Sequence, residues 1–347
     1  MSREALYIGI NHYDSEKWPL LSYCENDARS IAELLYDSDG GYDWSSPEKS
    51  LLLGSSARES RMLDQVKALF ADADGNDILF YFSGHADKLK RHDLLLASVE
   101  DDPDKDDERH GLRFSDLMKI IKQHPQVNTV TVILDCCHAG SIKNIDVPRN
   151  VVVLAAAREN QQAAELGDHG IFTASLLAGL QGGSADIFGN VTAVSLYADA
   201  SMAITSRGAR QQPVLKACLD KIIVLRHTQT GISRKQLRLL YTATDPRPEK
   251  QGCRIFSRAD KKFHPYPEME KSTASEGKMR TGQERPDELT PSMKLMEDFK
   301  IWRDAHLVNI DADDGNHDLY WACIKGGTIS LTLRGQYYWN LAAKGLI

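Results

Sequence analysis

The sequence predicts an α/β fold in which helices cover both faces of a doubly wound sheet. Three observations predict it. Short apolar runs alternate with stretches whose apolar residues recur at helical spacing, up to about residue 226. Two of the runs, DILFYF (77–82) and NTVTVIL (128–134), are apolar almost without interruption, as in strands that are buried on both faces. Turn-forming residues bound the runs, so each is interpreted as a separate strand.

The alternation predicts an order of elements along the chain. The first strand is ALYIGI (5–10), and the amphipathic stretch NDARSIAELLYD (26–37) predicts the helix that follows it. The other expected strands are 50–54, 77–82, 128–134, 150–157 and 212–225. The other expected helices are 57–73, 113–124, 170–182 and 193–207. Strands and helices that alternate in this way form a single α/β domain, which we expect to span residues 1–226.

The composition changes after residue 226. Residues 227–289 include a long stretch that is rich in Pro, Gly, Ser and charge and poor in aliphatic residues, so we expect a flexible linker there. Residues 290–347 then predict a helix, a β-hairpin that turns at Gly326–Gly327, and a second helix. This order indicates a small α+β module that is winged-helix-like.

The composition also bounds the class of protein. Of the 347 residues, 42% are hydrophobic and 26% are charged, and the formal net charge is −7. These values predict a soluble protein and argue against nucleic acid or a membrane as the main partner. The six cysteines lack metal-ligand spacing, and the N-terminal residues show no export signal. We therefore expect a cytoplasmic protein with reduced thiols.

Two predicted strands end in residues that can carry chemistry. His85 follows one strand in ILFYFSGHAD, and Asp135, Cys136, Cys137 and His138 end another in TVILDCCHAGS. Ligands of doubly wound sheets gather at the carboxyl ends of the strands. Taken alone, Cys136 and Cys137 are more simply interpreted as small buried hydrophobes, the commonest role of a free cysteine. His85 taken alone is more simply interpreted as a strand-end histidine that satisfies backbone groups. His85, however, precedes Cys137 by 52 residues, an order and interval typical of caspases.

With these motifs the chain resembles the caspase-like cysteine peptidases, and the metacaspases and their bacterial relatives more than the animal caspases. YFSGHA resembles the histidine motif of the family, and DCCHAGS resembles its cysteine motif. INHY…LSYCENDARSI, VVVLAAARENQQAAE…GIFTASLLAGL and QQPV resemble further family segments. The resemblance implies a mostly parallel six-stranded sheet over residues 4–226. Ala139 stands where metacaspases usually have Ser, and the Gln-Ala-Cys signature of animal caspases is absent.

The resemblance also implies the roles of the site residues. Cys137 is the nucleophile, and His85 is the general base and acid. The backbone N–H groups of Gly84 and Cys137 form the oxyanion hole. Side chains alternate along a strand, so Cys136 is expected in the core. His138 is a poor candidate for the base, because adjacent residues rarely direct their side chains at the same atom.

Two acidic residues match family positions that line the primary specificity pocket, Asp27 and Asp135. Carboxylates at the base of a pocket favour an Arg or Lys side chain. We therefore expect cleavage after Arg, less readily after Lys, and not after Asp. Two alternatives remain: Asp27 as a helix cap, and Asp135 as a structural hydrogen-bond acceptor.

The stretch SVEDDPDKDDERHG (98–111) is a candidate calcium loop through Asp101, Asp102 and Asp104, because many metacaspases require calcium. A solvated acidic loop is the alternative, since the spacing is not that of an EF-hand and Asn144 replaces a family aspartate. No other cofactor is expected. Loops with basic residues are candidate sites of self-cleavage by a basic-specific protease. These are SIKNIDVPRN (141–150) and the linker, at Arg247, Lys250, Arg254 or Arg280.

The resemblance thus implies a cysteine endopeptidase that acts on a protein or peptide substrate. It also implies a zymogen-type bacterial protease in regulated cell death or antiviral defence. The C-terminal module lies outside the resemblance, and its modest basic and aromatic content favours a regulatory protein over nucleic acid as its partner. The alternative is a catalytically silent scaffold that acts through that module, although a scaffold has no need of His85 and Cys137. A Cys-dependent hydrolase of another type is a third interpretation, which leaves the specificity carboxylates unexplained.

Overall fold

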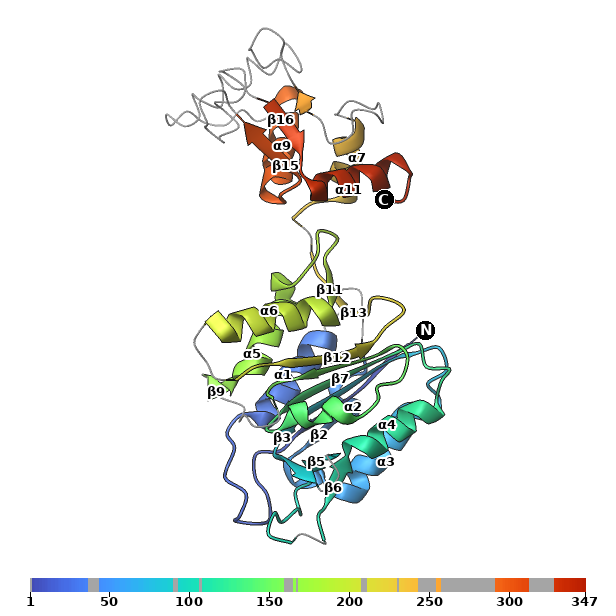
Figure 1. Ribbon diagram of the computed structural model, residues 1–347, viewed down its shortest axis with the longest axis vertical. Helices are drawn as coiled ribbons and strands as arrows, with labels where there is room; N and C mark the ends of the chain where they lie inside the picture. The colour runs from blue at the N-terminus through green and yellow to red at the C-terminus, as the bar shows by residue number, and fades with distance from the viewer. Residues whose placement is uncertain are drawn as a thin grey trace. The chain divides into compact units, whose positions relative to one another are not determined.

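The chain folds into two compact units in a computed structural model, Met1–Gln229 and Thr230–Ile347. The residues that the structure describes are 2–36, 44–89, 93–105, 108–158, 165–166, 168–206, 211–229, 231–242, 254–256, 291–311 and 328–347. All the candidate site residues named above belong to the first unit. Figure 1 shows the helices and strands of both units along the chain.

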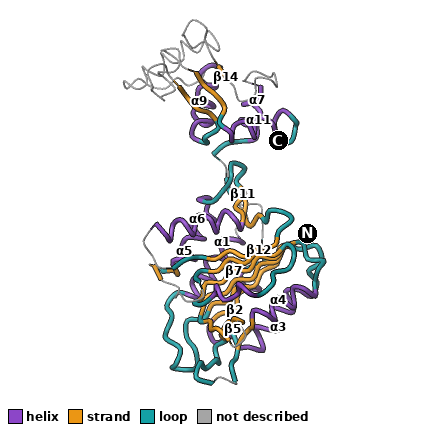
Figure 2. The backbone as a smooth tube through the Cα atoms, in the orientation of Figure 1, coloured by secondary structure: helices purple, strands orange, loops and turns teal. Residues whose placement is uncertain are grey.

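A six-stranded sheet forms the centre of the first unit, and its strands lie side by side in Figure 2. In their order across the sheet the strands are β12 (Val214–Cys218), β8 (Val151–Ala155), β7 (Thr129–Cys136), β3 (Asp77–Gly84), β1 (Arg3–Gly9) and β2 (Leu51–Leu53). Only β12 is antiparallel to its neighbour; the other pairs are parallel. The predicted doubly wound, mostly parallel six-stranded sheet is confirmed.

Helices cover both faces of this sheet, as the sequence predicts (Figure 1). One face packs against α3 (Glu59–Ala71) and α4 (Phe114–Gln123) through buried residues such as Phe70 and Phe114. The other packs against α1 (Cys24–Tyr36), α5 (Ile171–Ala178) and α6 (Ala193–Ser206), with Phe172 fully buried. Every residue of β3 and β7 is buried, which explains their apolar runs.

Shorter elements connect the main ones. A three-stranded antiparallel sheet is formed by β4 (Ala86–Leu89), β5 (Asp93–Ala97) and β6 (Gly111–Arg113), and β9 (Glu165–Leu166) pairs with β10 (His169–Gly170). Short helical segments are α2 (Pro47–Ser50), η2 (Gly54–Ser56), η4 (Ala139–Asn144) and η5 (Gly179–Gly183).

The expected strand 212–225 differs from the structure. The polar turn at Asp220–Lys221 divides it into β12 and β13 (Val224–His227). The second piece leaves the central sheet and pairs with β11 (Asn190–Thr192) instead.

The second unit contains α7 (Arg234–Thr242), β14 (Arg254–Phe256), α9 (Pro291–Asp304), β15 (Val308–Asp311), β16 (Thr328–Leu331) and α11 (Leu333–Ala343). The helix α7 lies in the segment expected to be a linker. It is ordered because Leu237 and Leu240 are fully buried. The strand β16 pairs with β14 and β15, whereas the rest of the predicted hairpin lies outside the described residues. The winged-helix-like interpretation and the domain limits stay predictions.

Three of the four linker positions considered for self-cleavage, Arg247, Lys250 and Arg280, lie outside the described residues. Arg254 begins β14 and is paired with Ser330 of β16. Among the helices that the structure describes, none combines the length and the apolar character that a bilayer span requires.

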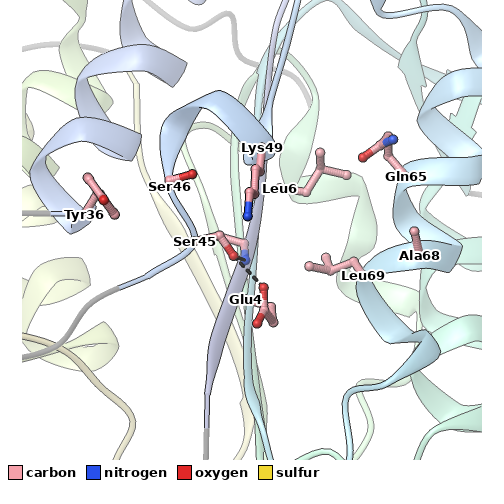
Figure 3. A pocket seen from close by; sticks show the side chains of 10 residues that line it. Glu4, Leu6, Tyr36, Ser45, Ser46, Lys49, Gln65, Ala68 and Leu69 are labelled. Carbon is pink, nitrogen blue, oxygen red and sulfur yellow. Dashed lines mark hydrogen bonds between the residues drawn. The ribbon is translucent and has the colours of Figure 1, made fainter.

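A cavity of about 500 Å³ lies beside the first residues of β1, toward the end of the sheet where that strand begins. Figure 3 shows that Ser45 and Glu4 are joined by a hydrogen bond there, and the Ser45 hydroxyl donates to the Glu4 carboxylate at 2.6 Å. The cavity is lined by Glu4, Ala5, Leu6, Tyr36, Ser45, Ser46, Lys49, Gln65, Ala68 and Leu69. None of the candidate catalytic residues lines this cavity. They lie at the carboxyl ends of the strands, at the opposite end of the sheet.

Candidate active site

The pairing of β3 with β7 brings the two predicted catalytic residues together. The strands are parallel and in register from Asp77 and Thr129 to Gly84 and Cys136. His85 and Cys137 are the next residue on each strand, so they leave neighbouring strand ends side by side. Both line one cavity of about 50 Å³. Its lining consists of Leu21, Cys24, Asp27, Ser83, Gly84, His85, Asp135, Cys136, Cys137 and Gly170.

The loop between β1 and α1 surrounds the imidazole of His85. The Nε2 atom lies 2.7 Å from the carbonyl oxygen of Pro19. A carbonyl oxygen only accepts, so Nε2 is the donor and Nδ1 is the basic nitrogen of the neutral ring. The Trp18 indole stacks on the imidazole at a centroid distance of 4.5 Å and an interplanar angle of 14°. Burial lowers the pKa of His85 below its ordinary value of 6.5, and the hydrogen bond to Pro19 opposes that shift.

The adjacent cysteines have different environments. Cys136 is 1% exposed and belongs to the core beneath α3 and α4, as the alternation predicts. Burial raises the pKa of its thiol well above the ordinary value, so this thiol stays protonated and inert. Cys137 is partly exposed. His138 has left-handed backbone dihedral angles, with φ of 56°, so the chain turns sharply directly after Cys137.

Gly84 is required by a close contact. A Cβ added there would lie 2.7 Å from the Tyr13 hydroxyl oxygen. That oxygen accepts the backbone N–H of His85 at 2.8 Å, so the N–H of His85 is already paired. Gly84 lines the cavity with Cys137, and their assignment to the oxyanion hole stays a prediction.

The two carboxylates predicted to set the specificity, those of Asp27 and Asp135, converge on Gly170. A Cβ added to Gly170 would lie 2.7 Å from Asp135 Oδ2 and 3.3 Å from Asp27 Oδ2. Asp27 is 2% exposed and Asp135 is 5% exposed, and both line the cavity that holds Cys137. Asp27 and Asp135, which precede Gly170 by 143 and 35 positions in the sequence, thus form one acidic wall of the cavity.

Residues that the sequence analysis did not single out hold these carboxylates. Thr173 donates to Asp135 Oδ2 from both its hydroxyl, at 2.6 Å, and its backbone N–H, at 3.2 Å. Asp135 is therefore also the structural acceptor that the alternative interpretation expected. His169 Nδ1 lies 2.8 Å from Asp27 Oδ1, and the backbone N–H of Gly170 donates to the same carboxylate. The family resemblance of GIFTASLLAGL was the only sequence signal for this segment.

The three carboxylates of the candidate calcium loop are engaged by protein donors. Asp101 is fully buried, and Arg109 donates to both of its oxygens, from Nε at 3.0 Å and from Nη2 at 2.9 Å. Asp104 pairs with Lys17 at 3.0 Å, and Asp102 accepts the backbone N–H of Asp104 at 3.1 Å. Within the described part of the chain no cluster of three or more metal-ligating side chains occurs. Asp101, Asp102 and Asp104 therefore do not fit a shared calcium ion.

Comparison with known proteins agrees with this geometry. A family model described as the caspase domain matches residues 2–223. Metacaspase-1 of Schizosaccharomyces pombe is 29% identical over 204 residues, which cover 55% of this chain and 45% of that protein. Metacaspase-2 of Trypanosoma brucei brucei is 28% identical over 167 residues, covering 41% of this chain and 42% of that protein.

The matched region spans less than half the length of either metacaspase. A solved structure of caspase-1 from Spodoptera frugiperda aligns with a TM-score of 0.45 and 12% identity over 66% of this chain and 91% of that chain. The family model extends over well more than half of the chain and includes both strand ends of the candidate site. This chain belongs to the caspase-domain family of cysteine peptidases.

Proposed function

We propose that this chain is a cysteine endopeptidase that cleaves proteins after basic residues, Arg more readily than Lys, by a Cys137–His85 dyad. One observation carries the proposal. The β3–β7 register pairs Gly84 with Cys136, and the residue after each, His85 and Cys137, lines the same cavity as two buried carboxylates. The proposed role in regulated cell death or defence rests on the family resemblance alone. The proposed regulatory partner of the second unit rests on the modest basic and aromatic content of residues 290–347.

The tautomer of His85 defines the proton path. Nε2 donates to the Pro19 carbonyl, so Nδ1 accepts the proton of the Cys137 thiol. The thiolate attacks the carbonyl carbon of the scissile peptide, and N–H groups of the oxyanion hole hold the negative oxygen. The C–N bond then breaks, and His85 returns the proton to the leaving amine. Water, deprotonated by the same nitrogen, hydrolyses the thioester and releases the acid and the thiol.

The acidic wall supports the preference for basic side chains. Asp27 and Asp135 meet at Gly170, whose missing side chain lets both carboxylates approach its backbone closely. A guanidinium has donors in a planar fork that matches carboxylate oxygens, whereas an ammonium is a compact point charge. Arg should therefore bind better than Lys. An Asp side chain would bring a third carboxylate to this wall and be repelled.

Peptide reporters test the function. Purified protein should cleave an Arg-terminated reporter fastest, a Lys-terminated one more slowly and an Asp-terminated one not measurably, because only cations complement Asp27 and Asp135. Cys137→Ala should abolish cleavage, whereas Cys136→Ala, the adjacent and buried control, should retain it. An Asp reporter cut faster than its Arg counterpart would contradict the pocket assignment. A folded wild type that cuts no reporter would favour the silent scaffold.

Thiol alkylation tests the dyad without any peptide. Iodoacetamide at pH 6 should modify Cys137 at least about tenfold faster than Cys218, because only Cys137 lies beside an imidazole that can take its proton. Cys218 is the more exposed of the two, so accessibility alone predicts the opposite order. His85→Ala should remove the difference. Peptide mass spectrometry measures the rate at each cysteine, and equal rates in the wild type would count against the dyad.

Gly170→Ala tests the acidic wall. The added methyl group would displace Asp135 Oδ2 or fill the space beside it, so kcat/KM for the Arg reporter should fall by about tenfold or more. Alkylation of Cys137 should stay at the wild-type rate, since the dyad is untouched. Gly231→Ala is the matched control, because a Cβ there meets nothing within 4 Å. Unchanged cleavage by Gly170→Ala would place the basic side chain elsewhere.

A further inference from the structure

The side chain of Trp18 determines how the His85 ring is held. Its indole lies parallel to the imidazole, while Tyr13 contacts the same ring at a tilt, with a centroid distance of 5.0 Å. The next residue in the chain, Pro19, accepts the hydrogen bond of Nε2. All three come from the loop after β1, so the orientation of the imidazole depends on where that loop lies.

A second loop fixes Trp18. The indole Nε1–H donates to Asp101 Oδ2 at 3.1 Å across 83 residues of sequence. Arg109 holds Asp101 in a bidentate ion pair and also donates from Nη1 to Asp87 Oδ2 at 2.9 Å. Its guanidinium carbon lies 5.8 Å from the centroid of the Trp18 ring. Asp101 and Arg109, with side chains 0% and 6% exposed, therefore form a buried anchor.

The anchor leaves Asp101 no capacity for a metal ion. An ionised carboxylate has about four lone-pair positions. Oδ1 accepts from Arg109 Nε and from the backbone N–H of His110 at 2.8 Å, and Oδ2 accepts from Arg109 Nη2 and Trp18 Nε1. The positive charge that this carboxylate needs is supplied by a side chain of the protein.

We propose that Trp18 is a positioning residue for His85 and that the Asp101–Arg109 ion pair holds the Trp18 indole in place. The guanidinium of Arg109 is then a built-in cation, through which the acidic loop supports catalysis instead of through calcium. The expected effect on catalysis rests on the proposed function, in which His85 is the base of the dyad. The contacts of Trp18 with His85 and Asp101 do not depend on that function.

The titration of His85 reports on this arrangement. The titratable and charged groups around the ring are Tyr13 from the loop after β1, Cys24 and Asp27 from α1, Asp135, Cys136 and Cys137 from β7 and its end, and Asp101 and Arg109, which hold Trp18. Burial is the main cause of the lowered pKa of His85. Truncation of Trp18 exposes the ring to water, so the pKa should rise toward 6.5.

The experiment compares Trp18→Ala and Trp18→Phe in the full chain with Lys17→Ala. Lys17 joins the same two loops through Asp104, but both side chains are largely exposed, so its loss should change little. We expect Trp18→Ala to raise the pKa of His85 in NMR titrations and to lower kcat by about tenfold or more, with KM within about twofold. Trp18→Phe keeps a stacking ring without the N–H donor, so we expect a smaller loss.

Arg109→Lys keeps the positive charge but not the planar guanidinium fork, so its kcat and the pKa of His85 should lie between those of the wild type and Trp18→Ala. EDTA should leave cleavage by the wild type unchanged. Unchanged pKa and kcat in both Trp18 variants would overturn the positioning role. Loss of wild-type activity in EDTA and its return with calcium would overturn the built-in cation. If the wild type cuts no peptide but Trp18→Ala still shifts the titration, the peptidase function fails while the positioning of His85 stands.

Discussion

The parallel pairing of β3 with β7 is the constraint on which the candidate site depends. The two strands are paired over eight residues each, and every one of those residues is buried. A shift of one residue would turn all of these side chains to the opposite face of the sheet, so the core fixes the register. His85 and Cys137 follow the last pair directly. Their proximity is therefore a consequence of core packing rather than of contacts between the two side chains.

The same alternation divides the residues that precede His85 and Cys137 between the two faces of the sheet. Tyr81 and Ile133 pack beneath α1 and α5, whereas Phe82 and Cys136 pack beneath α3 and α4. On the first face a hydrogen-bond chain ends at Asp135. Thr173 gives its hydroxyl proton to that carboxylate, so Tyr81 must be the donor to Thr173 at 2.6 Å. Burial raises the pKa of Tyr81 well above its ordinary value, which keeps this donor protonated.

Local sequence patterns were sufficient for β3 and β7 and for the residues at their ends. Apolar runs predict β3 and β7, and the residues directly after them are then placed by the topology. The partners of those residues were not predictable in the same way. Pro19 and His85 are 66 residues apart, and Asp27 and His169 are 142 apart, so their contacts depend on how loops close in three dimensions. Tryptophan and threonine in a loop or helix carry no local sign of such a role.

The acidic loop shows that a local pattern of charge does not identify the partner of each carboxylate. Five aspartates within SVEDDPDKDDERHG suggested a cation, and Arg109, from the same stretch, pairs with the first of them. A composition averaged over residues 227–289 likewise conceals the apolar spacing of Leu237 and Leu240 in α7, a helix that lies within the segment predicted as a linker. In both stretches, the few residues that determine the local structure lie within a segment whose average composition is polar.

The two side chains of the proposed dyad are thus held by different kinds of structure. Cys137 leaves a strand whose position is set by the core, whereas the ring of His85 is oriented by two loops that meet at Asp101. A buried ion pair adds little net stability, but loss of one partner leaves an uncompensated buried charge and is strongly unfavourable. The Asp101–Arg109 pair lies within one of these loops and fixes the carboxylate that accepts the Trp18 indole N–H from the other. The support of His85 therefore depends on a buried ion pair, whereas the position of Cys137 depends on the central sheet.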